Sequence, residues 1–325
     1  MAFEILEPGL ATTVQDRGRP GYYHVGLPQG GSMDQLSAEM ANAIVGNTPA
    51  EAVLECTYMG PRLRTDAAAV IAVTGAPVDV KVNGEPREQW ARLELSAGDE
   101  LSFGVIQGGT RFYLAVRGGI DVPVVLGSRS TYSLGAVGGL DGRALRAGDT
   151  VPVGATDAAA RPGLPGIAPE LRPTFPKEVD VRVLVGLYDH RLTEEGLATF
   201  LNSTWTLTPV ADRMGLRYAG PEIEWKPRTQ PFGAGSDPSN IVDAGYAVGS
   251  IQIPGGKEPI VLHRDAVSGG GYAMVATVIS ADMDLLARSA PGTTTRFRAV
   301  TMEQALAARH ELDGVRSALW GGTAP

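Results

Sequence analysis

The chain has 325 residues, a formal net charge of −8 and one cysteine, with 43% apolar and 20% charged residues. The acidity and the absence of a basic stripe argue against nucleic-acid binding, and one cysteine excludes an intrachain disulfide framework. No apolar run approaches the ~20 residues of a membrane span, and the N-terminus lacks a signal-peptide pattern, so we expect a cytoplasmic protein without a membrane partner.

Glycine and proline are frequent along the whole chain. The 42 Gly and 23 Pro predict many short elements joined by tight turns, and therefore a mainly β fold. Residues 2–7 alternate and predict a strand. Residues 52–154 predict a succession of strands and turns, in which Asn83-Gly84 is a hairpin signal.

The clearest helix of the first half is predicted over residues 33–46, with Ser32 and Gln35 as a capping box. Gly30 and Gly31 precede it. Free amides at a helix start, reached through two glycines, suit a carboxylate or phosphate, so Gly30, Gly31 and Ser32 are candidates for anion binding. The alternative is an ordinary loop that leads into a helix.

A Pro-rich stretch, residues 155–176, predicts a semi-rigid linker. It separates an N-terminal domain, 1–154, from a C-terminal domain, 177–313, and residues 314–325 are predicted to be a loose tail.

The second half predicts short helices at 193–202 and 302–312, between strands. Residues 226–249 are rich in Gly, Pro and Ser and predict a long loop without periodicity. Tyr272 follows three glycines. It is a candidate donor to a ligand oxygen, and the alternative is that the glycines form a bulge or hinge.

An internal repeat links the two halves. The pattern T-x-V-x-D-R-x4-Y occurs at 12–22 and again at 208–218, which indicates two related halves. Each copy contains an acid–base pair: Asp16 with Arg17, and Asp212 with Arg213. Structural ion pairs that brace a turn are the favoured interpretation, and an Arg that binds a carboxylate substrate is the alternative.

Arg129 lies among hydroxyls in G-S-R-S-T, beside Ser128, and Arg143 lies in G-L-D-G-R-A-L. A guanidinium suits a carboxylate or phosphate, although exposed turns carry the same composition. Cys56 is interpreted as a small buried apolar residue. Four scattered histidines argue against a histidine-built metal site, so we expect no metal.

Several longer motifs occur in order along nearly the whole chain: P-G-L-A-T-T-V-Q-D-R-G-R-P-G-Y (8–22), G-N-T-P-A-E-A-V-L-E-C-T-Y-M-G-P (46–61), R-F-Y-L-A-V-R-G-G-I (111–120), G-G-L-D-G-R-A-L-R-A-G-D (138–149) and I-Q-I-P-G-G-K-E-P-I-V-L (251–262). With them the chain resembles the allophanate hydrolase subunit 2 family, also called the biotin-dependent carboxyltransferase-type family. That family includes the C-type subunit of 5-oxoprolinase, part of urea carboxylase, and the antagonist of the Kip sporulation kinase inhibitor.

The resemblance implies two cyclophilin-like β-barrel domains and a hetero-oligomer with an allophanate hydrolase subunit 1-type partner, and in 5-oxoprolinase with a third subunit. It implies a small-molecule substrate and ATP, shared with the partner subunits. Biotin would come only on another protein, because no lysine lies in an A-M-K-M context. Two segments of the C-terminal half depart from the family pattern: residues 265–272 lack the usual Arg and first Thr, and the segment 226–249 is longer than usual.

Three functions follow from the resemblance. The first is a subunit of an ATP-dependent 5-oxoprolinase, a hydrolase inactive alone; the second is a carboxyltransferase or allophanate hydrolase subunit; the third is a non-enzymatic regulator that binds a kinase-inhibitor-like partner. Opening a lactam needs donors for developing negative charge. The residues expected to supply or position them are Arg129, Arg143, Asp16 and Arg17 as catalytic residues, and Gly30, Gly31, Ser32, Ser128, Tyr272 and Arg213 as substrate- or anion-binding residues.

Overall fold

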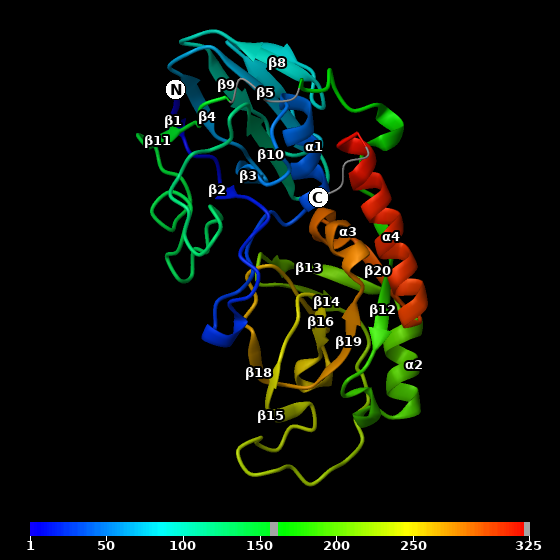
Figure 1. Ribbon diagram of the computed structural model, residues 1–325. Coiled ribbons are helices and arrows are strands. Elements are labelled where there is room, and N and C mark those ends of the chain that lie inside the picture. The colour runs from blue at the N-terminus through cyan, green and yellow to red at the C-terminus, as the bar shows by residue number, and fades with distance from the viewer. Residues whose placement is uncertain (157–161, 322–325) are drawn as a thin grey trace. The chain divides into compact units, whose positions relative to one another are not determined.

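The computed structural model describes residues 1–156 and 162–321. It is mainly β, as expected, and divides into two compact units (Figure 1). The first unit contains residues 1–19, 30–175 and the chain from Leu319 onward; the second contains 20–29 and 176–318. The chain passes from the first unit to the second between Phe175 and Pro176, at the last position of the predicted linker. The other described linker residues belong to the first unit, where Ile167 is buried.

Strands of the first unit form two sheets that enclose one apolar core. One sheet has the order β11-β1-β4-β9-β6-β7 and the other the order β2-β3-β10-β5-β8. The strands are β1 Ala2–Glu7, β2 Ala11–Gln15, β3 Val53–Thr57, β4 Arg62–Thr65, β5 Ala69–Gly75, β6 Val80–Val82, β7 Glu85–Arg87, β8 Arg92–Leu95, β9 Glu100–Phe103, β10 Arg111–Val116 and β11 Thr150–Pro152. The strand predicted at 2–7 is confirmed, as is the Asn83-Gly84 hairpin, which joins β6 to β7 with both residues at positive φ.

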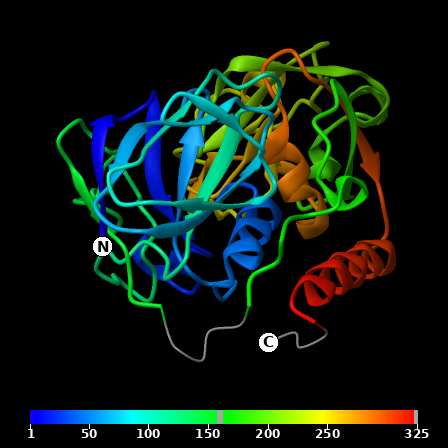
Figure 2. The ribbon, with the colours of Figure 1, turned by 90° about the horizontal axis from the view of Figure 1, so that it is seen from above.

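Helix α1, Gln35–Val45, packs on the outer side of β5 and β10 (Figures 1 and 2). It begins two residues later than predicted. The cap is Asp34, whose carboxylate accepts the Ser37 amide, and not Ser32. Long-range bonds hold the chain before Asp34 in a non-helical path: the Ser32 amide donates to the Asp16 carbonyl at 2.8 Å.

The second unit is a closed barrel with the order β12-β19-β16-β17-β14-β13-β20, in which β12 and β20 pair in parallel. Its strands are β12 Glu178–Val185, β13 Trp205–Ala211, β14 Gly215–Ala219, β16 Ser250–Gln252, β17 Ile260–Leu262, β19 Met274–Val278 and β20 Thr294–Ala299. A separate ribbon pairs β15, Asn240–Gly245, with β18, Gly269–Tyr272. The prediction of an unstructured loop over 226–249 is therefore wrong at its C-terminal end, because β15 buries only Ile241 and shows no regular alternation that would reveal a strand.

Helices of the second unit are α2 Glu194–Asn202, α3 Met283–Arg288 and α4 Met302–Leu319. The Thr193 cap of α2 and the Thr301–Gln304 capping box of α4 are confirmed. Helix α4 continues through Gly314, so the prediction of a loose tail from 314 is wrong as far as Leu319. Burial of Leu319 and Trp320 outweighs the weak helix propensity of one glycine. Residues 322–325 lie outside the described part.

Candidate functional site

The carboxylate of Asp16 joins two loops of the first unit. Its Oδ1 accepts the Gly18 amide at 2.7 Å and the Ser128 hydroxyl at 2.6 Å. Its Oδ2 accepts the Arg129 amide at 2.6 Å, and the Ser130 hydroxyl also donates to Oδ1. Four donors from two segments more than 110 residues apart in sequence thus meet at one carboxylate, so Asp16 determines where the loop of residues 128–130 lies.

The segment before α1 lies against the same place. Gly31 has φ +89°, and a Cβ there would be 2.8 Å from the Arg17 carbonyl carbon, so a larger residue would be strained and would clash. Ser32 is buried, and its Oγ has no hydrogen-bond partner within the described residues. It lines a cavity of about 10 Å³, room for about one water. Other residues lining this cavity include Asp16, Arg17, Gln35, Glu39 and Glu51.

The backbone amides just before α1 already donate hydrogen bonds to side chains of the protein. The Met33 amide donates to Glu55 Oε2 at 2.7 Å, and the Asp34 amide donates to the Tyr113 hydroxyl at 2.8 Å. The Tyr113 hydroxyl in turn donates to Glu55 at 3.0 Å. Burial, and then the nearby carboxylates of Glu55 and Asp34, raise the pKa of Tyr113 well above its usual range, so the phenol stays protonated. With the Ser32 amide bonded to Asp16, a ligand at Gly30, Gly31 and Ser32 would have to use groups other than these amides.

Arg129 and Arg143 differ in what their guanidinium groups can still bind. Arg143 forms a two-pronged ion pair with Asp149 at 2.7 and 2.9 Å and also pairs with Asp141. Arg129 donates to the Val122 carbonyl at 3.0 Å and pairs with Asp121 at 2.9 Å. Its Nη1 makes no hydrogen bond with the described residues. Arg129 is therefore oriented by the protein and keeps a free donor edge, which makes it the stronger candidate of the two.

The internal repeat corresponds to a shared turn. Asp16 Oδ1 accepts the amide two residues on, and Asp212 Oδ1 likewise accepts the Met214 amide at 2.7 Å. These are turns in which an Asp side chain bonds its own backbone, placed directly after β2 and β13.

Both arginines of the repeat pair with carboxylates from other segments. Arg17 lies 3.2 Å from Glu39 on α1, and Arg213 forms a two-pronged pair with Asp265 at 2.7 and 2.9 Å. Neither Asp16 with Arg17 nor Asp212 with Arg213 forms an ion pair within the described residues: each aspartate braces its turn through amides, and each arginine pairs with a carboxylate of another segment.

The structure brings six of the predicted residues into one region of the first unit: Asp16, Arg17, Gly31, Ser32, Ser128 and Arg129. Arg143 braces a separate turn, and Arg213 and Tyr272 belong to the second unit. Tyr272 is 40% exposed on β18, and its backbone amide donates to the Tyr246 hydroxyl. Sequence reasoning missed Glu55 and Tyr113, although Glu55 stands in an apolar strand pattern where a carboxylate is unusual.

Cys56 is buried in the core of the first unit. Burial raises the pKa of its thiol well above the usual range and outweighs the effect of a Thr12 hydrogen bond, so the reactive thiolate is suppressed.

The pKa of the Cys56 thiol is higher in the folded than in the unfolded protein. The thiol therefore contributes its full share of the unfolding free energy below about pH 8.5, and this contribution falls as the pH rises further. Relative to Cys56→Ala, the wild-type protein should lose up to about 1.4 kcal/mol of unfolding free energy per pH unit above that point. Urea denaturation at pH 7.5 to 10 measures the difference. If the unfolding free energies of the two proteins change with pH in the same way, the pKa of the Cys56 thiol does not differ between the folded and unfolded states, and the prediction is wrong.

No helix in residues 1–156 and 162–321 combines the length and the hydropathy that crossing a membrane requires. Within the same ranges no group of three or more His, Cys, Asp or Glu side chains is placed to hold a metal ion.

The fold and the site define a mainly β protein of two units, with a carboxylate-centred loop cluster in the first. Residues 25–299 match the model of the carboxyltransferase domain, subdomain A and B. The chain therefore belongs to this carboxyltransferase domain family.

Two kinds of relative are similar over nearly the whole chain. Urea amidolyase of Lachancea kluyveri is 34% identical over 99% of the chain, which spans only 18% of that protein. The C-type subunit of 5-oxoprolinase from Escherichia coli is 33% identical over 95% of the chain and 94% of the relative. The crystal structure of K. lactis urea amidolyase superposes with a TM-score of 0.92 at 36% identity, covering 98% of this chain and 20% of that one.

Proposed function

We propose that this chain is the C-type subunit of an ATP-dependent 5-oxoprolinase, which opens 5-oxo-L-proline to L-glutamate together with an allophanate hydrolase subunit 1-type partner and a third subunit. The observation that carries the proposal is the similarity to the C-type subunits of two 5-oxoprolinases, over 94% of the relative from Escherichia coli and 97% of the one from Haemophilus influenzae. The urea amidolyases match over less than a fifth of their length.

The chemistry that this subunit would serve is difficult because an unactivated lactam is a poor electrophile. Transfer of a phosphoryl group from ATP to the lactam oxygen creates a leaving group, and water then completes the opening. The developing negative charge needs donors that are already in position. Arg129 supports this role, because Asp16 fixes its backbone and Asp121 orients its guanidinium while Nη1 remains free among the described residues.

The test is reconstitution with both partner subunits, with 5-oxoproline-dependent ATP hydrolysis and glutamate formation as readouts. Replacing Arg129 with Ala should lower kcat roughly 100-fold, the usual effect of losing one such donor, while urea denaturation and complex assembly stay unchanged. Arg87→Ala, which removes an exposed arginine of the same unit, is the matched control. An assembled wild-type complex that forms no glutamate would rule out the proposal, and an Arg129→Ala chain that fails to assemble would make the residue structural.

A carboxyltransferase subunit of a urea carboxylase is the second candidate, favoured by the TM-score of 0.92 with K. lactis urea amidolyase. Biotin would then arrive on a separate carrier protein. The same reconstituted complex, supplied with a carboxylated biotin carrier and urea, distinguishes the two: urea-dependent loss of carboxybiotin without glutamate formation supports this alternative.

A further inference from the structure

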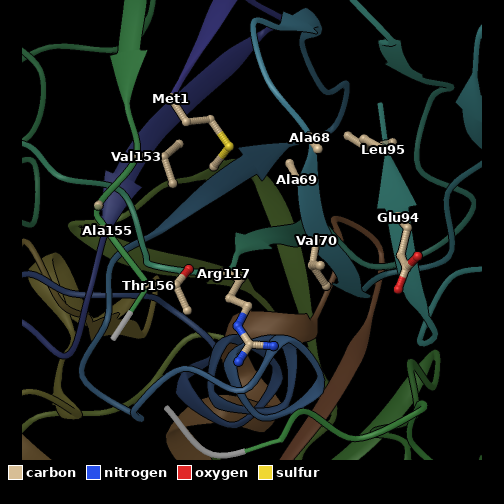
Figure 3. Close-up of a pocket in the computed structure, with 11 residues that line it drawn as sticks. Met1, Ala68, Ala69, Val70, Glu94, Leu95, Arg117, Val153, Ala155 and Thr156 are labelled. Atoms are coloured by element: carbon tan, nitrogen blue, oxygen red, sulfur yellow. The ribbon is translucent and has the colours of Figure 1, made fainter. Parts of the chain in front are cut away.

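A second pocket of the first unit lies apart from the Asp16 region and shares none of the residues that line the cavity there. Its volume is about 630 Å³, within the usual range for small-molecule sites. Most of its lining is apolar and comes from the N-terminus, β5, β8 and the chain that follows β11: Met1, Ala68, Ala69, Val70, Leu95, Val153, Gly154 and Ala155, with Thr156 and Glu94 at its edge (Figure 3).

Arg117 is the cationic side chain of this lining, and it lies between Val70 and Thr156 (Figure 3). It directly follows β10, and its amide donates to the Val70 carbonyl at 2.8 Å, which fixes its backbone. The side chain is partly buried. Its Nε is shielded from solvent without a hydrogen-bond partner, and within residues 1–156 and 162–321 no ion pair or hydrogen bond involves the guanidinium.

Arg129 and Arg143 of the same unit each pair with an aspartate at 2.9 Å or less. Arg228 and Arg296 of the second unit are also partly buried without a hydrogen bond or ion pair to the described residues, but neither lines this pocket.

Glu94, the acidic residue at the pocket edge, is 78% exposed and lies 3.6 Å from Arg92. Among residues 1–156 and 162–321, Arg117 therefore has no counter-charge. A partly buried cation in that state is costly, so the group calls for an explanation. A ligand that brings the missing negative charge provides one.

We propose that this pocket binds a small organic monocarboxylate, with its carboxylate on Arg117 and its apolar body against Val70, Leu95 and Val153. A single guanidinium fork matches a planar carboxylate with two parallel hydrogen bonds and neutralises its one charge. A phosphate dianion would carry a second negative charge that one guanidinium does not neutralise, beside the carboxylate of Glu94, which favours the monocarboxylate. The inference does not depend on the proposed enzymatic function, since it concerns binding to this chain alone.

The experiment uses three ligands that share one alkyl chain: hexanoate, hexanamide and hexyl phosphate. Binding to the full chain is measured by calorimetric titration and by ligand-observed NMR. Hexanoate should bind saturably. Hexanamide should bind roughly tenfold or more weakly, as expected for loss of a charge-assisted hydrogen bond. Hexyl phosphate should also bind more weakly than hexanoate, because its second negative charge is not neutralised beside Glu94. Arg117→Gln should weaken hexanoate binding by a similar factor and leave hexanamide binding unchanged.

Two further variants separate this site from general charge effects. Arg87→Gln removes the same charge from an exposed position of the first unit and should leave hexanoate binding unchanged. Ala68→Trp fills the pocket from an exposed loop position without altering charge and should also weaken binding. Lack of saturable hexanoate binding by the wild-type chain overturns the proposal. So does equal binding of hexanoate and hexanamide, or hexanoate binding that survives both Arg117→Gln and Ala68→Trp.

Discussion

Replacing Asp16 with Ala is expected to lower the free energy of unfolding of the first unit by about 3–5 kcal/mol, a large loss for one polar side chain. Hydrogen bonds to a charged group contribute about 1.5–3 kcal/mol each, and they are not additive around one carboxylate. Two of the donors, the hydroxyls of Ser128 and Ser130, are almost completely buried, so they would lose their acceptor without gaining water. Urea denaturation measures the loss, and hydrogen exchange of amides 128–131 should accelerate with it.

The matched control is Asp212→Ala at the equivalent repeat position. Asp212 is exposed, and its Oδ1 accepts only the amides of Met214 and Gly215 among the described residues. We expect a loss of about 1 kcal/mol there, the usual effect of one solvated turn or cap interaction. Equal losses for the two variants would contradict the conclusion that Asp16 holds two loops together, since both would then act only on their own turn.

Local patterns in the sequence predicted the features that depend on neighbouring residues. Asn83-Gly84 specifies its hairpin because both residues tolerate positive φ, and Thr193 specifies the start of α2 because its hydroxyl accepts the Gly196 amide. The repeat also predicted two β units correctly, since each copy encodes the same turn after a strand. In all these cases the energetics are determined within a few residues of chain.

The capping error shows where local reasoning fails. Ser32 and Asp34 both suit an N-cap, and the sequence pattern favours Ser32 because Gln35 follows three residues later. Bonds to distant residues decide otherwise, because Asp16 and Glu55 accept the amides of Ser32 and Met33 and keep them out of the helix. The same limit applies to Arg117, since a sequence does not show that its guanidinium lies in a pocket where no described residue accepts its hydrogen bonds.

Replacing Glu55 with Leu is expected to cost about 3–5 kcal/mol, because it removes one partner of a buried ion pair. Glu55 is 1% exposed, and its Oε1 lies 3.6 Å from Nε of Arg111, which is 7% exposed. The change would also leave the Met33 amide without the acceptor that holds the chain before α1. Glu55→Gln keeps an acceptor oxygen, so we expect a smaller loss of about 1–2 kcal/mol. Urea denaturation of both variants provides the comparison.

A double-mutant cycle separates the charge pair from the hydrogen bonds. If the cost arises mainly from an uncompensated Arg111, then Glu55→Leu combined with Arg111→Leu should lose clearly less than the sum of the single losses, since an apolar pair can replace a buried ion pair at little cost. Additive losses would show that the Met33 amide and the Tyr113 hydroxyl dominate instead. In that case Glu55 would act chiefly as the hydrogen-bond acceptor at the start of α1. Its carboxylate would then take the place that the sequence had predicted for the carboxylate or phosphate of a ligand.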